Sequence, residues 1–357
     1  MSHSLNSSRG SIFGIIFVAI FALFATFISN LAQIQVLGIS PLVIGILMGI
    51  FYANTLHNQT PASWQSGITF SAKKILRFAI VIYGFRITFQ QIAEVGMDGF
   101  LVSLIMLTST LILGSWLGTR VFGMDKDTSI LTASGASVCG AAAVLATEPV
   151  LKAEEHKTAI AVSMVVLFGT VSMFLYPVLY TTIFENTSGF LHMSPREFGI
   201  YVGSTIHEVA QVIAVPASIP NLNINSAEEM ANTAVIVKMT RVIMIAPMLI
   251  VLGLYLAYTA KKEGGLRDKK IKLVIPWFAV YFVLIAGFNS LQLIPQNIVD
   301  IINEIDTFLL TMAMTALGMG TVFAKFKGLG LAPVYTATSM FVWLLVGGFV
   351  VVKLLCA

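Results

Sequence analysis

The stretch "SGASVCGAAAVLATEP", residues 134–149, lies in the middle of a chain that is apolar almost throughout. Small residues dominate its first ten positions, and small residues let membrane helices pack closely, so helix packing is one sufficient explanation. However, glycine costs about 1 kcal/mol in a helix interior, and packing does not explain the ending Glu148-Pro149. The stretch therefore predicts a helix break, which at membrane depth is tolerated only inside protein or beside a cavity.

The composition indicates that the bilayer is the solvent of this chain. Of its 357 residues 57% are hydrophobic and 11% are charged, whereas soluble domains carry about 25% charged residues. The apolar segments do not alternate with period two, so the predicted fold class is an all-α polytopic membrane protein. One integral membrane domain, residues 1–357, is expected to contain eleven hydrophobic segments: 11–32, 39–54, 70–91, 100–122, 128–151, 157–184, 197–217, 232–259, 273–290, 298–324 and 331–355.

Weak internal repeats divide the chain into an extra N-terminal span (11–32), a first half (39–184) and a second half (197–355). Residues 76–96 align with 310–330 without a gap and share identities such as Gly84 with Gly318 and Gly96 with Gly330. A second alignment has a constant offset of 68 residues and matches Gly135, Ala142, Val144 and Ala146 with Gly203, Ala210, Val212 and Ala214. Inverted repeats of this kind are typical of secondary transporters.

The distribution of charge predicts the orientation. Basic clusters, which mark cytoplasmic loops, lie at 261–272, at 73–77 and at 325–327. The first apolar run is longer than the core of a signal peptide. It is therefore expected to stay as the first span of a multi-pass protein of the bacterial inner membrane. The N-terminus is expected in the cytoplasm and the C-terminus on the periplasmic side.

Ionisable residues within apolar segments are costly and therefore indicate function. The segment 197–217 contains His207, Glu208 and Gln211, which form either a polar network between helices or an ion-coupling site. A break there would let His207 and Glu208 face one cavity, and Glu208 is the expected proton carrier. Glu148 or a sodium site is the next candidate. Three cations are expected as charge partners or as snorkelling side chains: Lys238, Arg241 and Arg86.

The expected substrate site lies where the breaks expose backbone N–H groups and helix N-termini, which attract anions. Its predicted residues are Ser134, Ser137, Cys139, Gly140 and Gln211. Gly318 is a further candidate, although a kink or packing explains it more simply. No Walker motif, zinc-ligand set, nucleophile elbow or nucleic-acid signature is present, so neither an enzyme, a cofactor nor a bound metal is expected. The expected partners are a small anion, a proton or sodium ion, the lipid bilayer and, as one option, further copies of the chain.

These motifs resemble the YeiH-type family of bacterial inner-membrane proteins, which are described as candidate sulfate exporters. The resemblance is carried by "SGASVCGAAAVLATEP", "HEVAQV" and the paired "YGFRITF" and "ALGMGTVF" segments, and it covers nearly the whole chain. It implies a fold distantly similar to the bile acid/sodium symporters, with crossing broken helices. The residues themselves leave two options open for 128–151 and 197–217, full crossing or re-entrant hairpins, and the resemblance favours crossing.

The predicted function is a secondary transporter that exports a small oxyanion of the sulfate, sulfite or organosulfonate class. Coupling to a proton or other ion gradient is expected because the chain has no ATP site. An uncoupled anion channel and a transporter of small organic carboxylates are the alternatives.

Overall fold

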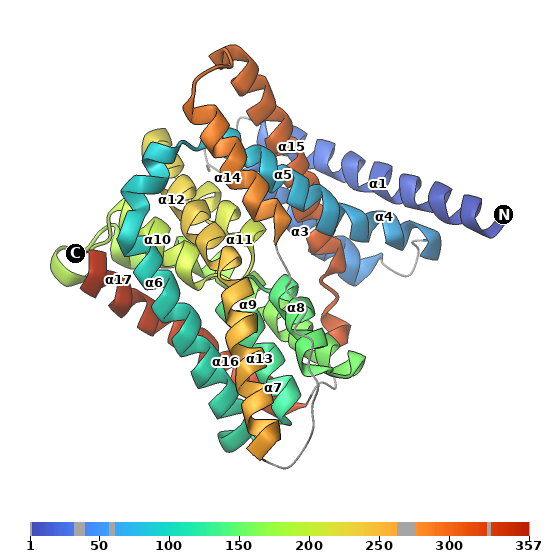
Figure 1. The fold of residues 1–357 in the computed structure, drawn as a ribbon. Coiled ribbons are helices and arrows are strands. Elements are labelled where there is room, and N and C mark those ends of the chain that lie inside the picture. Colours follow the sequence, from blue (N-terminus) through green and yellow to red (C-terminus); the bar gives the residue numbers. More distant parts are fainter. Residues whose placement is uncertain (1, 32–39, 57–60, 263–275, 327–329, 357) are drawn as a thin grey trace.

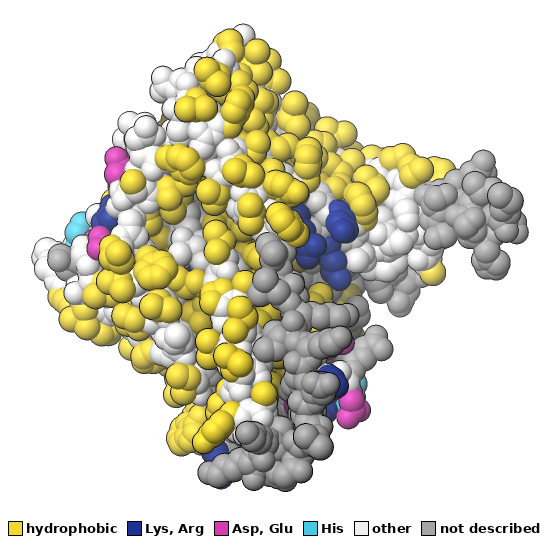
Figure 2. Space-filling view, viewed as in Figure 1, with side chains coloured by type: hydrophobic (Ala, Val, Ile, Leu, Met, Phe, Trp, Pro, Cys, Tyr) yellow, Lys and Arg dark blue, Asp and Glu magenta, His cyan; other side chains and the backbone are white. Residues whose placement is uncertain are grey.

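The computed structural model describes residues 2–31, 40–56, 61–262, 276–326 and 330–356, and all of their regular elements are helices. Five helices in this part are long and apolar enough to cross a membrane: 10–29, 89–121, 156–184, 224–259 and 331–356. Large apolar side chains also cover the visible outer surface (Figure 2). These findings confirm an all-α polytopic membrane protein. The basic cluster at 261–272 lies outside the described residues except for the last two residues of α13.

We name the two ends of the bundle after the chain termini: α1 (Ser2–Ser29) begins at the N face, and α17 (Gly348–Cys356) ends at the C face (Figure 1). Packing contacts give the direction of the other helices. Gly10 lies against Ser63 and Gly14 against Gly67, so α4 (Gln65–Phe70) runs parallel to α1. Gly45 lies against Thr311 and Gly49 against Thr315, so α3 (Pro41–Thr55) and α15 (Gln296–Gly320) are also parallel.

Nine described segments run between the two faces. From the N face to the C face run α1, the continuous helix α4–α5 (α5 Leu76–Tyr83), α9 (Glu155–Leu179), α14 (Trp277–Ser290) and α16–α17 (α16 Leu331–Val342). In the opposite direction run α3, α6 (Phe89–Trp116), α12–α13 (Ile224–Ile243 and Ile245–Lys262) and α15. Short π-helical turns extend α6, α9 and α16 and leave their direction unchanged.

The segment after α6 is a re-entrant hairpin, which we call hairpin 1. It consists of α7 (Lys126–Ser137), a turn at residues 138–140 and α8 (Ala141–Leu151). Lys157, just beyond α8, forms ion pairs with Asp125 and Asp127 at the start of α7, at 3.0 and 3.3 Å. Both ends of the segment therefore lie at the N face. Full crossing, which the family resemblance favoured, is wrong for this segment.

Hairpin 2 enters from the C face and consists of α10 (Pro195–Thr205), a turn at residues 206–208 and α11 (Val209–Ala214). Gly199 packs on Met230 and Gly203 on Ala234, so α10 runs parallel to α12. The chain must therefore return to the C face between α10 and α12. Full crossing is wrong here as well. The two hairpins enter from opposite faces, which makes the 68-residue repeat an inverted one.

The helices form two groups that meet along a seam. One group, which we call the arm, contains α1, α3, α4–α5, α14 and α15, and it extends away from the rest (Figure 1). The other group, the hairpin body, contains both hairpins with α6, α9, α12–α13 and α16–α17. Packing is dense within each group. A hydrogen bond of 3.3 Å from Tyr83 of α5 to Asn232 of α12 is one of the polar contacts that join them.

Candidate functional site

Each hairpin is interrupted at an equivalent position. Hairpin 1 breaks after Ser137 and resumes at Ala141, whereas hairpin 2 breaks after Thr205 and resumes at Val209. The offset of 68 residues therefore places Val138 opposite Ile206 and Gly140 opposite Glu208. Gly140 has φ +75°, a left-handed conformation that glycine adopts readily, so it allows the sharp turn. The breaks expose the C-termini of α7 and α10 and the N-termini of α8 and α11 at the centre of the hairpin body.

Lys238 and Arg241 of α12 occupy the space between the two turns, and the solvent-exposed fraction of each is 0%. The Lys238 ammonium donates to the carbonyl oxygens of Val138 and Ile206 at 2.7 and 2.6 Å, so one side chain joins both hairpins. The Arg241 guanidinium donates to the carbonyls of Ser137 and Ser204. These cations satisfy the last carbonyls of two helices and offset their negative dipole ends. Snorkelling of these two side chains, one of the sequence interpretations, is wrong.

Glu208 extends from hairpin 2 onto the first turn of α8. The backbone N–H of Ala141 donates to its carboxylate. A Cβ atom on Gly140 would lie 2.6 Å from Cγ of Glu208, so only glycine leaves room for this side chain. The backbone N–H of Glu208 donates to Oε1 of Gln211 at 3.1 Å, while Nε2 of Gln211 is buried and has no hydrogen-bond partner among the described residues. Nδ1 of the adjacent His207 is also buried and has no hydrogen-bond partner among the described residues.

The remaining residues of the expected substrate site are distributed unevenly. Ser137, Cys139 and Gly140 lie at the turn of hairpin 1, and Ser134 lies one helical turn earlier, with its hydroxyl donating to the carbonyl of Leu131. Glu148 lies near the far end of α8, about two helical turns from the break. Gly318 lies in α15, where it packs on Ile46 and Gly49 of α3. The structure therefore gives Gly318 a packing role in the arm, as the simpler interpretation had it, and does not bring it to the hairpin turns.

Sequence reasoning missed that three basic residues lie in the middle of a membrane-spanning helix. Lys73, Lys74 and Arg77 were expected at the start of a span, but the continuous helix α4–α5 begins at residue 65, so the two lysines lie about halfway along it. All three side chains are exposed, and basic side chains gather beside this helix on the side of the hairpin body (Figure 2). Charged groups within membrane segments face protein or water. Lys73 is also one of the two cations that act on Glu208.

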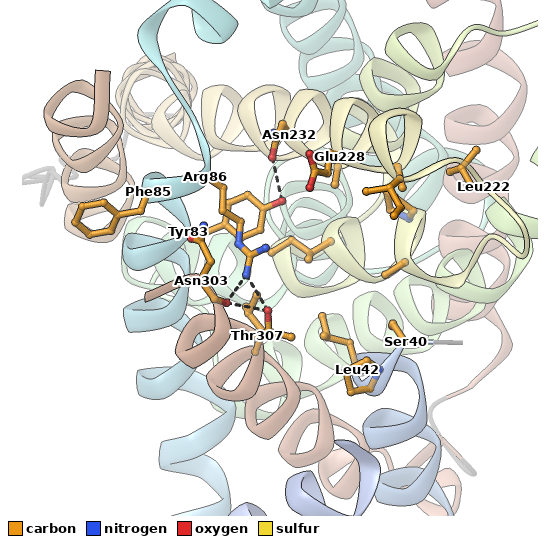
Figure 3. A pocket seen from close by; sticks show the side chains of 18 of the residues that line it. Ser40, Leu42, Tyr83, Phe85, Arg86, Leu222, Glu228, Asn232, Asn303 and Thr307 are labelled. Atoms are coloured by element: carbon orange, nitrogen blue, oxygen red, sulfur yellow. Dashed lines mark hydrogen bonds between the residues drawn. The ribbon is translucent and has the colours of Figure 1, made fainter. Parts of the chain in front are cut away.

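A vestibule of about 770 Å³ opens at the C face, between the arm and hairpin 2. Figure 3 shows Arg86 pointing toward Asn303 and Thr307 of α15, and Tyr83 toward Asn232. Arg86 also forms an ion pair of 3.2 Å with Asp306, whose side chain is fully buried. The guanidinium is therefore a charge partner of Asp306 and does not contact the hairpin turns. Ile213 of α11 and Pro216, just beyond that helix, line the same vestibule, so it borders the helix of hairpin 2 that begins directly after Glu208.

At the N face, hairpin 1 is held by charge and capping. Asp125 accepts from the backbone N–H and the hydroxyl of Thr128 at 3.1 and 2.5 Å. Partial burial raises the pKa of Asp125, but the hydrogen bonds from Thr128 and the charge of Lys157 outweigh this effect, so the pKa lies below its usual value. Asp125 is therefore ionised at neutral pH and remains paired with Lys157.

Comparison with known proteins agrees with the motifs. Residues 13–337 match the family model described as conserved hypothetical protein 698. The chain is 44% identical to a UPF0324 membrane protein of Pseudomonas putida over 97% of this chain and 94% of the relative. The chain belongs to the UPF0324 family. Another UPF0324 relative is the inner membrane protein YeiH of Escherichia coli K12, 46% identical over 87% of this chain and 84% of the relative. A UPF0324 protein of Bacteroides thetaiotaomicron is 41% identical over 96% of this chain.

Proposed function

We propose that this UPF0324 protein is a secondary transporter of the bacterial inner membrane that carries a small oxyanion. One observation carries the proposal: two half-membrane hairpins from opposite faces meet at a buried cationic pair, Lys238 and Arg241. Discontinuous helices that meet at the membrane midplane are the common design of transporter binding sites. An enzyme or receptor has no evident need for such symmetry about the membrane plane.

The charges around the site favour an anion as substrate. The N-terminus of α8 presents backbone N–H groups at the turn, and the unused Nε2 of Gln211 is a further donor beside it. Lys73, Lys74 and Arg77 are exposed on α4–α5, and the Lys73 charge acts on Glu208. Sulfur oxyanions such as sulfate, sulfite and organosulfonates present several acceptor oxygens, which suits converging N–H donors. We therefore propose these anions, with Glu208 as the group that carries a coupling proton.

We further propose that the N face is cytoplasmic. Arg120, Lys126, Lys152 and Lys157 lie near the N-face ends of their segments, whereas Glu94, Asp98 and Glu185 lie near the C face. Lysine and arginine accumulate on the cytoplasmic side of inner-membrane proteins. This orientation agrees with an N-terminus inside and a C-terminus outside, and the name of the E. coli relative, an inner membrane protein, supports the location.

Counterflow in proteoliposomes tests the proposal. Vesicles that contain the purified full-length protein are loaded with sulfate, sulfite, thiosulfate, methanesulfonate or acetate, and entry of a labelled anion from the same panel is measured. We expect saturable exchange of at least one sulfur oxyanion. Acetate exchange alone would point to a carboxylate transporter, and flux that neither saturates nor shows exchange would point to a channel.

Two glycine variants provide a matched control for this assay. Gly140→Ala forces a side chain into Glu208 at a residue with φ +75°, and we expect exchange to fall at least tenfold. Gly123→Ala introduces similar backbone strain at φ +68°, but no atom lies within 4 Å of the new Cβ. Equal exchange in both variants, once both are shown to fold, would contradict a site at the hairpin turns.

A further inference from the structure

The Glu208 carboxylate occupies the position that an anionic substrate would need. It interacts with the backbone N–H of Ala141, at the first turn of the 11-residue helix α8, and it also caps its own helix α11 by accepting from the backbone N–H of Gln211. Its Cγ lies over Gly140, so the side chain fills the space above the N-terminus of that helix. Helix N-termini bind carboxylates and oxyanions by the same N–H groups. The protein therefore already supplies an anion of its own at this position.

Unused donors beside Glu208 indicate that the position is built for a larger acceptor. Gln211 is fully buried, and while its Oε1 accepts from the Glu208 backbone, its Nε2 has no partner in the described part of the chain. A buried donor without a partner is destabilising. An oxyanion with several oxygens in place of the carboxylate could accept from both the Ala141 N–H and this amide.

The surrounding charges limit what the position can hold. The titratable groups that face Glu208 come from α12, from the helix α4–α5, from the turn of hairpin 1 and from its own turn: Lys238, Lys73, Cys139 and His207. The Lys238 and Arg241 donors already serve the carbonyl ends of α7 and α10. An ionised Glu208 and a second anion on the same N–H group would therefore repel each other at close range.

We propose that Glu208 is a tethered competitor of the substrate, so that a monovalent oxyanion binds only when Glu208 leaves the α8 N-terminus and takes up a proton. This inference rests on the transport function proposed above and specifies its substrate class and coupling. The proton comes from water on the open face, bonds to a carboxylate oxygen of Glu208 and returns to water on the other face when the anion leaves. Empty and loaded sites then carry the same charge, and one proton moves with each anion.

Methanesulfonate is a suitable probe because it stays monovalent at every pH between 5 and 8 and therefore carries no proton itself. Proteoliposomes that contain the full chain receive a methanesulfonate gradient while internal pH, anion uptake and membrane current are recorded. For the wild type we expect about one proton per anion, no net current and an apparent affinity that falls up to about tenfold per pH unit in the alkaline range. The glutamine of Glu208→Gln is neutral and cannot bind or release the coupling proton. Methanesulfonate uptake should therefore continue without proton movement, carry an electrical current and no longer depend on pH.

A matched variant and three results make the outcome decisive. Glu148→Gln removes another carboxylate of the hairpins, about two turns from the break, and should keep the proton that accompanies each anion. The inference is overturned if wild-type uptake carries current without proton movement, or if Glu208→Gln still moves one proton with each anion. Either result leaves the transporter proposal intact. Uptake of sulfate or thiosulfate but not of methanesulfonate would overturn only the inference that the substrate is monovalent. If no anion of the panel is transported, the proposed function itself fails.

Discussion

Replacing Lys238 by methionine should separate the two hairpins. Methionine has a similar length but no ammonium, so the buried carbonyls of Val138 and Ile206 lose the donor that lies 2.7 and 2.6 Å away. A buried acceptor without a partner costs about 1–3 kcal/mol, so two cost about 2–6 kcal/mol. Removal of a buried charge also relieves its desolvation cost, which places the net loss toward the lower end of that range.

The assay is thermal unfolding of the purified full-length protein in detergent, followed by intrinsic fluorescence. For a chain of 357 residues, a loss of about 2 kcal/mol corresponds to a midpoint about 3 °C lower. The matched control is Arg196→Met, which breaks a partly exposed ion pair with Asp98 and should cost no more than about 1 kcal/mol. As a second readout, the buried thiol of Cys139 at the turn of hairpin 1 should become reactive to maleimide in a Cys356→Ser background. If Lys238→Met melts no lower than Arg196→Met while Cys139 stays protected, the joint between the hairpins does not stabilise the fold.

Three further predictions concern topology, the vestibule and the basic approach. In a background without native cysteines, Glu154→Cys and Met124→Cys should react with an impermeant reagent from the same side and Glu185→Cys from the opposite side; labelling of Glu154→Cys together with Glu185→Cys would restore the crossing model. Arg86→Ala leaves the buried Asp306 carboxylate without its cation and should destabilise the protein by about 1–3 kcal/mol, less than for a fully buried pair because Arg86 is 28% exposed. Adding Asp306→Asn should recover most of that loss in a thermal melt, and no recovery would mean that the pair is not the cause. Lys73→Gln with Lys74→Gln should slow anion uptake roughly tenfold at low ionic strength and less in high salt, whereas Lys126→Gln should not; equal slowing by both would remove the basic approach from the mechanism.

The sequence predicts the discontinuities themselves well. Small residues with Gly140 at one break and the run His207-Glu208 at the other are visible because they disrupt an apolar pattern, and the 68-residue offset links them before any contact is known. The fold class follows from composition for the same reason. Each of these signals is carried by residue types and their order in the chain, without knowledge of spatial contacts.

The direction of the hairpins could not be read from the same residues. A crossing helix and a hairpin contain equal numbers of apolar positions, and the ion pair from Lys157 to Asp125 that distinguishes them joins residues 32 positions apart. The roles of Lys238 and Arg241 were equally hidden, because their partners are backbone carbonyls that carry no sequence signature. Gly318 shows the converse, since its candidate role came from residue type alone, whereas its neighbours Ile46 and Gly49 belong to a segment about 270 positions away.

The attachment of both hairpins to α12 has a mechanical consequence. Because Lys238 and Arg241 hold the carbonyl ends of α7 and α10 at once, neither hairpin can swing open alone without breaking hydrogen bonds made by a charge. The seam between the arm and the hairpin body offers far less resistance to displacement, with Tyr83 and Asn232 among the polar contacts across it. We therefore expect the arm and the hairpin body to move as two rigid bodies that slide along this seam. The binding position at the hairpin turns would move with the hairpin body.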